Sequence, residues 1–152
     1  MSLEENKALV RKVIEAFNKR NLALLDKLVA PDYIDHYHQL RSLEEFKQFL
    51  AMILKAFPDW HEDIEDIIAE GDKVWYRFEA TATHTGEYRG HLPSTGRKIT
   101  LAPTGKKIKP HGVIIYRIIN GKIAEAWEVS NLMDIYEPLG IIGYKEFPKD
   151  VS

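Results

Sequence analysis

Hydrophobic residues in the first part of the chain recur with the period of an amphipathic helix. The first helix is expected to follow Ser2, because Ser2-Leu3-Glu4-Glu5 is a capping box whose serine and glutamate side chains satisfy free backbone N–H groups. Its apolar stripe consists of Leu3, Val10, Val13, Ile14 and Phe17. A second, short helix is predicted from the capping residue Asn21 to Ala30-Pro31-Asp32, which ends it.

A second capping box, Ser42-Leu43-Glu44-Glu45, predicts a third helix that ends at Pro58-Asp59. Between these helices, residues 33–38 are interpreted as a short extended segment. From Trp60 onward the period changes to two, which is typical of strands. We expect strands at about 61–69, 72–84, 98–102, 108–119 and 122–130, followed by a short helix near 131–137.

The order of the elements indicates the fold class. Glu70-Gly71-Asp72 and Asn120-Gly121 are hairpin turns, so the strands are expected to form an antiparallel meander. Because the helices precede the strands, we predict a single α+β domain over residues 1–152, with the helices packed on one face of a strongly curved antiparallel sheet. Such a sheet encloses a cone, and its wide mouth is a common place for a small-molecule site.

The strand at 72–84 carries large side chains on both of its faces. One face has Val74, Tyr76, Phe78, Ala80, Ala82 and His84, and the other has Trp75, Arg77, Glu79, Thr81 and Thr83. Neither face is polar enough to be fully wetted, so we expect a homodimer in which two sheets pack back to back. Alternation does not say which face of strands 108–119 and 122–130 points inward.

Composition and charge exclude several classes of protein. The chain has 152 residues and no cysteine, so it has no disulfide framework, thiol nucleophile or thiolate metal site. A net charge of −2 gives no electrostatic footprint for nucleic acid. No apolar run approaches the ~20 residues of a membrane span, and the acidic, polar N-terminus does not fit a signal peptide. A cytoplasmic location fits this composition.

Two similar segments follow one another in the middle of the chain. Pro93-Ser94-Thr95-Gly96-Arg97-Lys98-Ile99 is nearly repeated as Pro103-Thr104-Gly105-Lys106-Lys107-Ile108. We interpret segment 93–108 as an extended loop or an extra hairpin with two Thr-Gly turns. Its basic residues form either a solvated hairpin or an anion-binding lip at the mouth of the cone.

Several histidines are candidates for chemistry. His36 and His38 would place two imidazoles on one face of a strand, a spacing that fits either a metal site or a pair at the rim of a pocket. No third ligand follows at a recognisable interval, so we predict no metal site. His36 is a candidate proton donor near a cavity mouth. His111, early in a predicted strand, is either a hydrogen-bonded core residue or a pocket acid or base.

Polar residues also stand out near the ends of the predicted strands. Arg77 is a charge inside an otherwise apolar strand, so we expect it to pair with Glu79, with Glu125 or with a carboxylate lining the cavity. A dense polar and aromatic cluster contains Trp127, Glu128, Asn131 and Asp134. Its last two members also fit a helix start, with an amide cap followed by an acid. No nucleotide-binding or nucleophile-elbow motif occurs.

Short segments of the chain match one family in the same order. They include Leu28-Val29-Ala30-Pro31-Asp32-Tyr33-Ile34-Asp35-His36, Phe57-Pro58-Asp59-Trp60-His61, Thr83-His84-Thr85-Gly86-Glu87 and Asn120-Gly121-Lys122-Ile123-Ala124-Glu125-Ala126-Trp127. With these segments, the chain resembles the SnoaL-like polyketide cyclases of the NTF2-like superfamily. The resemblance implies a cone of helices on a bent sheet, commonly a dimer, and a hydrophobic pocket with no metal or organic cofactor.

The resemblance also implies a reaction. Characterised cyclases of this family close a ring by intramolecular aldol addition, with an aspartate near the end of the last strand as acid and base. Family members often have that aspartate four residues after a tryptophan, and here Asn131 stands four residues after Trp127. An amide donates hydrogen bonds but does not act as a general base. Nearby substitutes for the base are His111, Asp134, Glu128 and His36.

Two functional hypotheses follow. The first is a cofactor-free enzyme that transfers protons on a small hydrophobic carbonyl compound, as a cyclase, isomerase or hydrolase. In it His111 or His36 exchanges the proton, and Asn131 and Arg77 stabilise negative charge. Its pocket walls would be Trp60, Tyr116 and Trp127. The second hypothesis is a non-catalytic dimeric module that binds a hydrophobic ligand or a protein partner, and neither hypothesis involves nucleic acid or a membrane.

Overall fold

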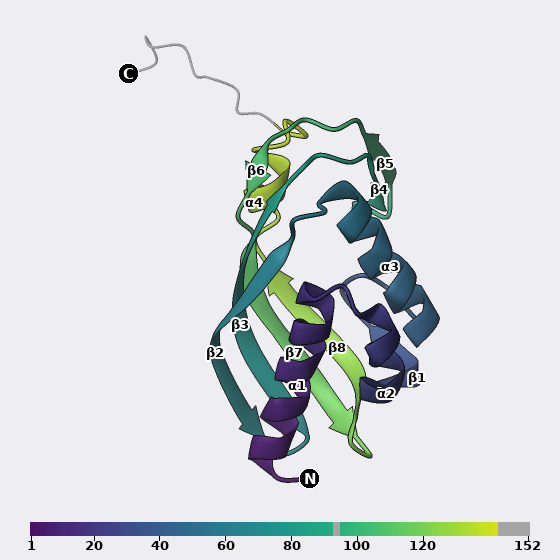
Figure 1. The fold of residues 1–152 in the computed structure, drawn as a ribbon, viewed down its shortest axis with the longest axis vertical. Coiled ribbons are helices and arrows are strands. Elements are labelled where there is room, and N and C mark those ends of the chain that lie inside the picture. Colours follow the sequence, from purple (N-terminus) through teal and green to yellow (C-terminus); the bar gives the residue numbers. More distant parts are fainter. Residues whose placement is uncertain (93–94, 143–152) are drawn as a thin grey trace.

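The fold is a curled sheet with helices on one of its faces (Figure 1). The computed structural model describes residues 1–92 and 95–142. In chain order, the elements of the first half are α1 (Leu3–Asn18), η1 (Leu22–Leu24), α2 (Leu25–Leu28), β1 (Val29–Asp35), α3 (Leu43–Ala56) and β2 (His61–Glu70). They are followed by β3 (Lys73–Thr83), β4 (Tyr88–His91), β5 (Lys98–Leu101), β6 (Lys107–Ile108), β7 (His111–Ile119), β8 (Lys122–Ser130) and α4 (Met133–Tyr136).

The main sheet is mixed, which corrects the prediction of an antiparallel sheet. Its strands lie in the order β1-β8-β7-β3-β2, and β6 pairs with the end of β3. All these pairs are antiparallel except β1 with β8, which is parallel. Alternation along a sequence carries no information about strand direction, so it did not reveal this pairing. Because β1 is an edge strand, Pro31 is tolerated in it although it has no N–H to donate.

The middle of the chain forms a hairpin outside the main sheet. Within the described residues, strand β5 pairs with β4 in a two-stranded ribbon, so an extra hairpin is present, but it spans 88–101 rather than 93–108. The predicted place of 98–102 in the meander is wrong. Gly96 and Gly105 have φ of +67° and +69°, which glycine adopts without strain, and they supply the two Thr-Gly turns. Pro93 and Ser94 lie outside the described residues.

The helix starts agree with the sequence to different degrees. At α1 both halves of the capping box form between Ser2 and Glu5. At α3 only one half forms: Ser42 accepts a hydrogen bond from the Glu45 N–H, while the Glu45 carboxylate binds the N–H of Arg41 instead. Asn21 makes no side-chain cap. No described helix combines the length and apolar character needed to cross a membrane.

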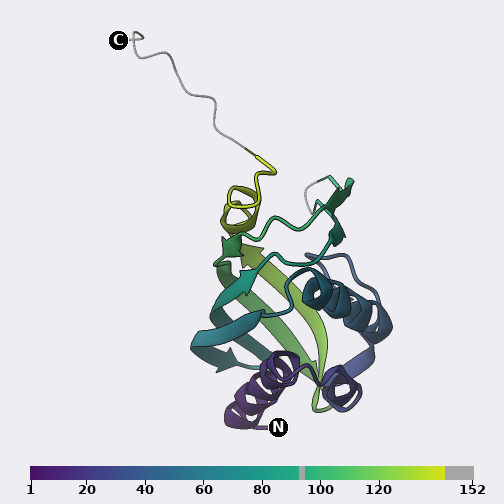
Figure 2. The ribbon, with the colours of Figure 1, turned by 45° about the horizontal axis from the view of Figure 1, so that its top comes forward.

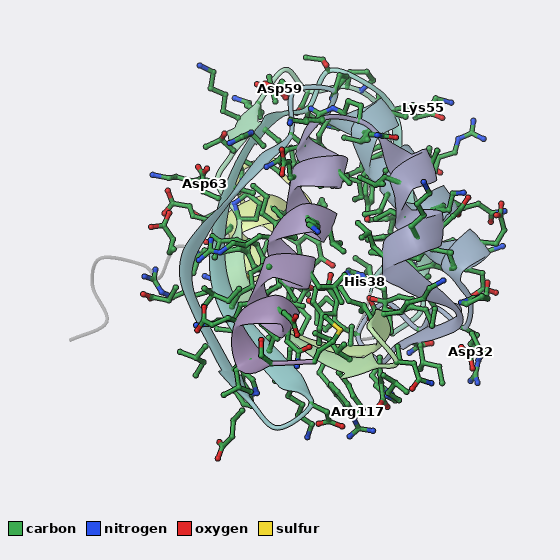
Figure 3. All side chains as sticks on the ribbon, turned by 60° about the horizontal axis from the view of Figure 1, so that its bottom comes forward. Asp32, His38, Lys55, Asp59, Asp63 and Arg117 are labelled. Atoms are coloured by element: carbon green, nitrogen blue, oxygen red, sulfur yellow. The ribbon has the colours of Figure 1, made fainter. Side chains whose placement is uncertain are left out.

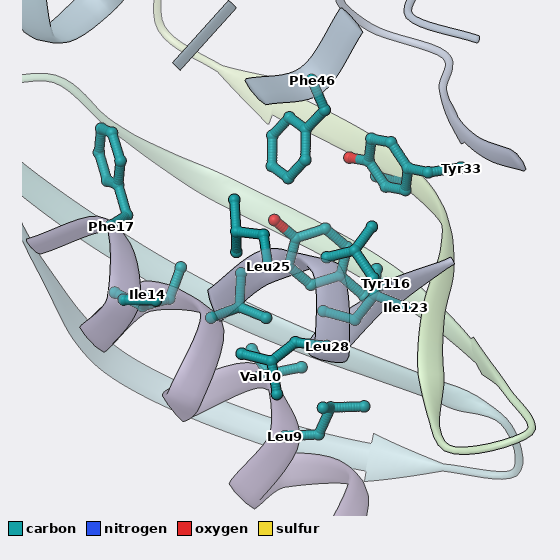
Figure 4. Packing of buried hydrophobic residues seen from close by; sticks show 14 of the residues in the cluster. Leu9, Val10, Ile14, Phe17, Leu25, Leu28, Tyr33, Phe46, Tyr116 and Ile123 are labelled. Atoms are coloured by element: carbon teal, nitrogen blue, oxygen red, sulfur yellow. The ribbon is translucent and has the colours of Figure 1, made fainter. Parts of the chain in front are cut away.

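The core lies between the concave face of the sheet and the helices. Figure 4 shows its centre, where Tyr116 of β7 lies among aliphatic residues of α1 and α2. Along β3, Val74, Tyr76 and Phe78 are buried, whereas Trp75 on the opposite face is 46% exposed. The concave face is therefore the one that carries the alternating apolar set.

Bulges curl the sheet and change which residues point inward. The pairing of β7 with β8 shifts between Arg117 and Ile118, and that of β2 with β3 shifts between Ile64 and Asp66. A bulge inserts a residue, bends the strand and increases its twist. Figure 2, with the top of the molecule turned forward, shows the curved sheet with α1 and α3 on the same side of it.

Candidate functional site

A turn after β1 directs two polar side chains toward the interior. Asp35 is buried, and its Oδ1 accepts hydrogen bonds from the backbone N–H groups of Tyr37 (2.9 Å) and His38 (2.8 Å). Its other oxygen accepts a hydrogen bond from Tyr33 Oη (3.3 Å). The turn is closed by paired backbone hydrogen bonds between Asp35 and Leu40. It is therefore a rigid local structure that fixes the direction of His38.

His38, in the turn after β1, pairs with Glu128 of β8. His38 Nε2 lies 3.4 Å from Glu128 Oε2, and the imidazole packs on Phe49 with ring centroids 4.2 Å apart. Figure 3 shows His38 between α1 and α3. Burial lowers the pKa of His38, but the hydrogen bond and charge of Glu128, together with Asp35, raise it, and the net shift is upward. The pair therefore joins an acid and a base within hydrogen-bond reach.

The carboxylate of Glu128 points to the interior and affects the pKa of several buried groups. It follows buried Ala126 by two residues on β8, so both point to the concave face. Its side chain is only 14% exposed. Burial is the main cause that raises the pKa of Glu62, Tyr33, Tyr37, Tyr76 and Tyr116, and the charge of Glu128 adds to the rise in each case. Tyr33, Tyr76 and Tyr116 are buried in the core on the same side of the sheet as Glu128.

A second carboxyl group, that of Glu62, lies in the same interior. Glu62 is at the start of β2, is 8% exposed, and accepts a hydrogen bond from Tyr76 Oη (3.2 Å). Tyr76 in turn packs against Tyr116 with ring centroids 5.8 Å apart. Burial is the main cause that raises the pKa of Tyr116 far above its ordinary value, so this hydroxyl keeps its proton.

Three polar atoms near these groups are buried without a hydrogen-bond partner among the described residues. They are Tyr37 Oη, Trp60 Nε1 and Ser130 Oγ. Ser130 follows Glu128 by two residues on β8. After burial, the charge of Glu128 is the next cause that raises the pKa of Tyr37. Buried polar atoms are nearly always hydrogen-bonded in native proteins, so these three point to water or a ligand polar group in the interior.

The structure brings together three of the predicted site residues at one end of the sheet. His111 Nδ1 lies 2.5 Å from Asp134 Oδ2, and the N–H of His111 donates to the same oxygen (3.2 Å). Asn131 accepts a hydrogen bond from the N–H of Met133 and donates one to Asp134, both at 3.2 Å. Helix α4 begins at Met133 with Leu132 at its N-cap and no side-chain cap, so the predicted amide cap at Asn131 is not formed. The imidazole of His111 is 58% exposed, so this cluster lies outside the cone.

A wide groove borders this cluster. It has a volume of about 1130 Å³ and lies between the end of β3, β6 and α4, with Asn131, Asp134, Thr83 and Lys107 among its lining residues. Polar side chains and charged side chains of both signs line the groove, so it is an open surface in contact with solvent. The groove and the interior cluster around Glu128 are thus two separate groups of polar side chains.

Three further predicted site residues lie on the convex face of the sheet. Trp127 is stacked on His36 with ring centroids 5.1 Å apart, and the Nε2 of His36 lies 2.6 Å from Glu125 Oε1. Arg77 pairs with Asp66 (2.6 Å) rather than with the expected glutamates. None of these side chains faces the interior. Of the predicted walls, Tyr116 is buried in the core and Trp60 packs against Phe17 and Phe57.

His36 and His38 do not share a face, contrary to the prediction. They lie in a turn, where His36 contacts Glu125 on the convex side and His38 contacts Glu128 on the concave side. Within the described residues, no group of three or more histidine, aspartate or glutamate side chains is placed to hold a metal ion.

Sequence reasoning missed Glu62 and gave His38 no separate role. Glu62 stands between the polar residues His61 and Asp63. The sequence therefore did not reveal that Glu62 lies on the same inward face of β2 as Ile64. The signal that could have found it is a carboxylate two residues before the first apolar position of a strand. For His38, the signal was Asp35, because an aspartate side chain commonly accepts hydrogen bonds from the backbone N–H groups two and three residues later in the chain.

Comparison with known proteins decides the family. The sequence model of the SnoaL-like polyketide cyclases matches residues 7–139. The chain belongs to this family. Aklanonic acid methyl ester cyclase DauD of Streptomyces sp. strain C5 is 27% identical over 139 residues, which cover 87% of this chain and 80% of that protein. The corresponding cyclase DnrD of Streptomyces peucetius is 26% identical, with 87% and 88% covered.

Solved structures agree with this SnoaL-like assignment. AclR of Streptomyces galilaeus, a candidate hydroxylase, superposes with a TM-score of 0.78 and 31% identity over 93% of this chain and 100% of that one. IdmH of Streptomyces antibioticus, a candidate polyketide cyclase, has a TM-score of 0.72 and 26% identity over 89% and 98%. These likenesses confirm the NTF2-like cone expected from the sequence. Because relatives of different described chemistry share the fold, the reaction has to be argued from the site.

Proposed function

We propose that this SnoaL-like protein is a cyclase-type enzyme that performs acid–base chemistry on a small hydrophobic carbonyl compound inside the cone. The observation that carries the proposal is the His38–Glu128 pair, which places a base and an acid 3.4 Å apart within a largely apolar interior. The unpartnered Tyr37 Oη and Ser130 Oγ beside the pair supply polar contacts for a ligand. Membership of a cyclase family supports the reaction class.

In the proposed reaction, Glu128 takes a proton from a carbon next to a carbonyl group, and the electron pair of that C–H bond forms an enolate. The enolate carbon then bonds to a second carbonyl carbon of the same molecule, which closes a ring. The resulting alkoxide takes a proton from Glu128 or His38, so no external reactant is needed. Low-dielectric surroundings and hydrogen-bond donors stabilise the enolate, and this is the main catalytic contribution of such a site.

Proton transfer is tested without knowing the natural substrate. The probe is 2-tetralone, a hydrophobic enolisable ketone, and the readout is deuterium incorporation next to its carbonyl in D₂O by NMR. We expect the protein to accelerate exchange and Glu128→Gln to lower the catalysed rate by about 10²-fold or more, as for loss of a general base. Glu125→Gln is the matched control, because Glu125 is on the same strand but faces away. Equal rates in both variants would refute the role of Glu128.

A second location for the chemistry is favoured by the His111–Asp134 pair beside the open groove. An aspartate that fixes a histidine tautomer is a common arrangement for a general base. His111→Ala in the same assay separates the two sites. Loss of exchange in His111→Ala with full exchange in Glu128→Gln would place the reaction in the groove.

The alternative function is a binding module without catalysis. It is supported by Asn131, which stands where family members often have the aspartate and here accepts a hydrogen bond from the N–H of Met133. This alternative predicts that 2-tetralone and related ketones bind without any exchange, and that Glu128→Gln changes affinity alone.

We further propose a homodimer through the convex face of the sheet. An apolar row crosses four strands in register there: Ile68 on β2, Trp75 on β3, Ile115 on β7 and Trp127 on β8. Ile68 is 66% exposed and Trp75 is 46% exposed, and ion pairs such as Arg77–Asp66 flank the row. An apolar centre with a rim of both charges fits a second copy of the same face.

The test of the dimer is its mass in solution, measured by light scattering after gel filtration. We expect the mass of two chains for the wild type and of one chain for Trp75→Glu, which places a charge in the centre of the row. Thr81→Glu, on the same face of β3 but outside the row, is the control and should stay dimeric. A monomeric wild type would contradict the proposal.

A further inference from the structure

The backbone of Glu62 is held at two points by one side chain of helix α1. Asn18 Oδ1 accepts a hydrogen bond from the Glu62 N–H (2.9 Å), and Asn18 Nδ2 donates one to the Glu62 carbonyl (2.8 Å). Glu62 is also paired with Ala80 in the register of β2 and β3. The carboxyl group is therefore placed by a rigid frame that involves both the helix layer and the sheet.

The surroundings of this carboxyl group favour its protonated form. Burial, followed by the charge of Glu128, raises the pKa of Glu62 to about 7, while Tyr76 and Trp60 oppose the rise. The titratable and charged groups that act on it are Glu128 from β8, Tyr76 from β3, Tyr116 from β7 and Asp63 from β2, and α1 contributes the neutral Asn18. None of these groups is a cation, and Arg11 and Glu15 of α1, with Lys19 at its C-cap, line a surface hollow together with Glu62.

The two carboxyl groups in the interior, those of Glu62 and Glu128, have side-chain partners of different chemistry. Glu128 has a basic partner, because the imidazole Nε2 of His38 lies 3.4 Å from its Oε2. Glu62 has a tyrosine hydroxyl as its partner and no imidazole or ammonium group. Environments that separate two carboxyl groups in this way are typical of sites in which one acts as base and the other as acid.

We propose that Glu62 is the acid of the site, a neutral carboxyl group that donates a hydrogen bond to the carbonyl oxygen of the substrate while Glu128 takes the proton from the adjacent carbon. This inference rests on the proposed function and narrows the substrate class to enolisable ketones with the C–H and C=O groups side by side. When it carries a proton, Glu62 accepts from Tyr76 with one oxygen and has its own O–H free to donate.

The proposed step is balanced. The C–H bond breaks, its proton passes to Glu128, and negative charge develops on the ketone oxygen. The O–H of Glu62 points to this oxygen and stabilises the charge without transferring a proton. Removing one such donor from an active site costs about 10²–10³-fold in rate.

Three variants test the inference in the 2-tetralone exchange assay. Glu62→Leu removes the donor, and its catalysed rate is expected to fall by about 10²-fold. Glu62→Gln keeps an N–H donor but does not ionise, so its rate should stay within about tenfold of wild type and no longer fall at alkaline pH. Glu65→Gln, an exposed position on the same strand, is the control and should match the wild type. An unchanged rate in Glu62→Leu would overturn the inference, as would an alkaline decline that persists in Glu62→Gln.

A spectroscopic measurement separates failure of this inference from failure of the proposed function. Infrared spectroscopy at pH 6 detects the C=O stretch of a protonated carboxylic acid. We expect that band in the wild type and its loss in Glu62→Gln, whether or not 2-tetralone is turned over. Absence of the band refutes the neutral acid even if Glu128 proves essential. If the band is present and no exchange occurs with any variant, the proposed reaction fails and the acid role of Glu62 fails with it.

Discussion

Because Glu62 is buried, the free energy of unfolding should fall as the pH rises, and a single substitution at Glu62 should remove this dependence. The folded state raises the pKa of this carboxyl group from 4.5 to about 7. Between these two values the folded chain binds a proton that the unfolded chain has lost. The free energy of unfolding therefore falls as the pH rises through this window, and the loss is complete above pH 7.

The size of this effect follows from the shift. At about 1.36 kcal/mol for each pH unit, moving the pKa from 4.5 to about 7 costs about 3 kcal/mol of stability at pH 8 relative to pH 4. For a domain of this size, that corresponds to roughly 6–12 °C in Tm. A glutamine in place of Glu62 keeps the shape of the side chain and carries no charge, so it should not show this loss.

The assay is chemical denaturation of wild type, Glu62→Gln and the exposed control Glu65→Gln at intervals from pH 4.5 to 8. Other groups also titrate, so the informative quantity is the difference between wild type and Glu62→Gln at each pH. We expect Glu62→Gln to gain about 3 kcal/mol on the wild type as the pH rises, with Glu65→Gln parallel to the wild type. Parallel curves for wild type and Glu62→Gln would refute the reasoning, because they would mean that Glu62 titrates alike in both states.

Two further predictions concern the ion pair and the helix caps. Glu128→Gln should lower the pKa of His38, because Asp35 is then the carboxylate left to oppose the effect of burial. NMR titration of the imidazole nitrogens measures this, and an unmoved pKa would contradict the pairing. Ser2→Ala should cost about 1 kcal/mol in denaturation experiments, because Ser2 caps α1. Asn21→Ala should cost under about 0.5 kcal/mol, since Asn21 makes no cap hydrogen bond; equal losses in both variants would contradict this.

Local patterns in the sequence predicted most of the elements. The capping box at Ser2 and the apolar stripe that follows it are short-range features, and α1 formed as expected. The turns at Gly71 and Gly121, both with positive φ, likewise joined the predicted hairpins. Strand direction was not predictable in this way, because the parallel pairing of β1 with β8 joins segments about 90 residues apart.

The candidate site depended on long-range placement. Trp127 and Glu128 are neighbours in sequence, yet one lies on the convex face with His36 and the other faces the interior with His38. Alternation predicted that they would separate, and it did not say which of them would be inside. That choice was made by packing against the helices, which cover only the concave face (Figure 1).

By itself the sequence determined the α+β class, the positions of most helices and strands, and the family, because capping, turn chemistry and hydrophobic period act over a few residues. Tertiary structure alone decided the direction of β1, the inward position of Glu128 and the burial of Glu62. The physical reason is that the pKa of a carboxyl group depends on the water and charges around it, and these come from strands and helices far away in the sequence.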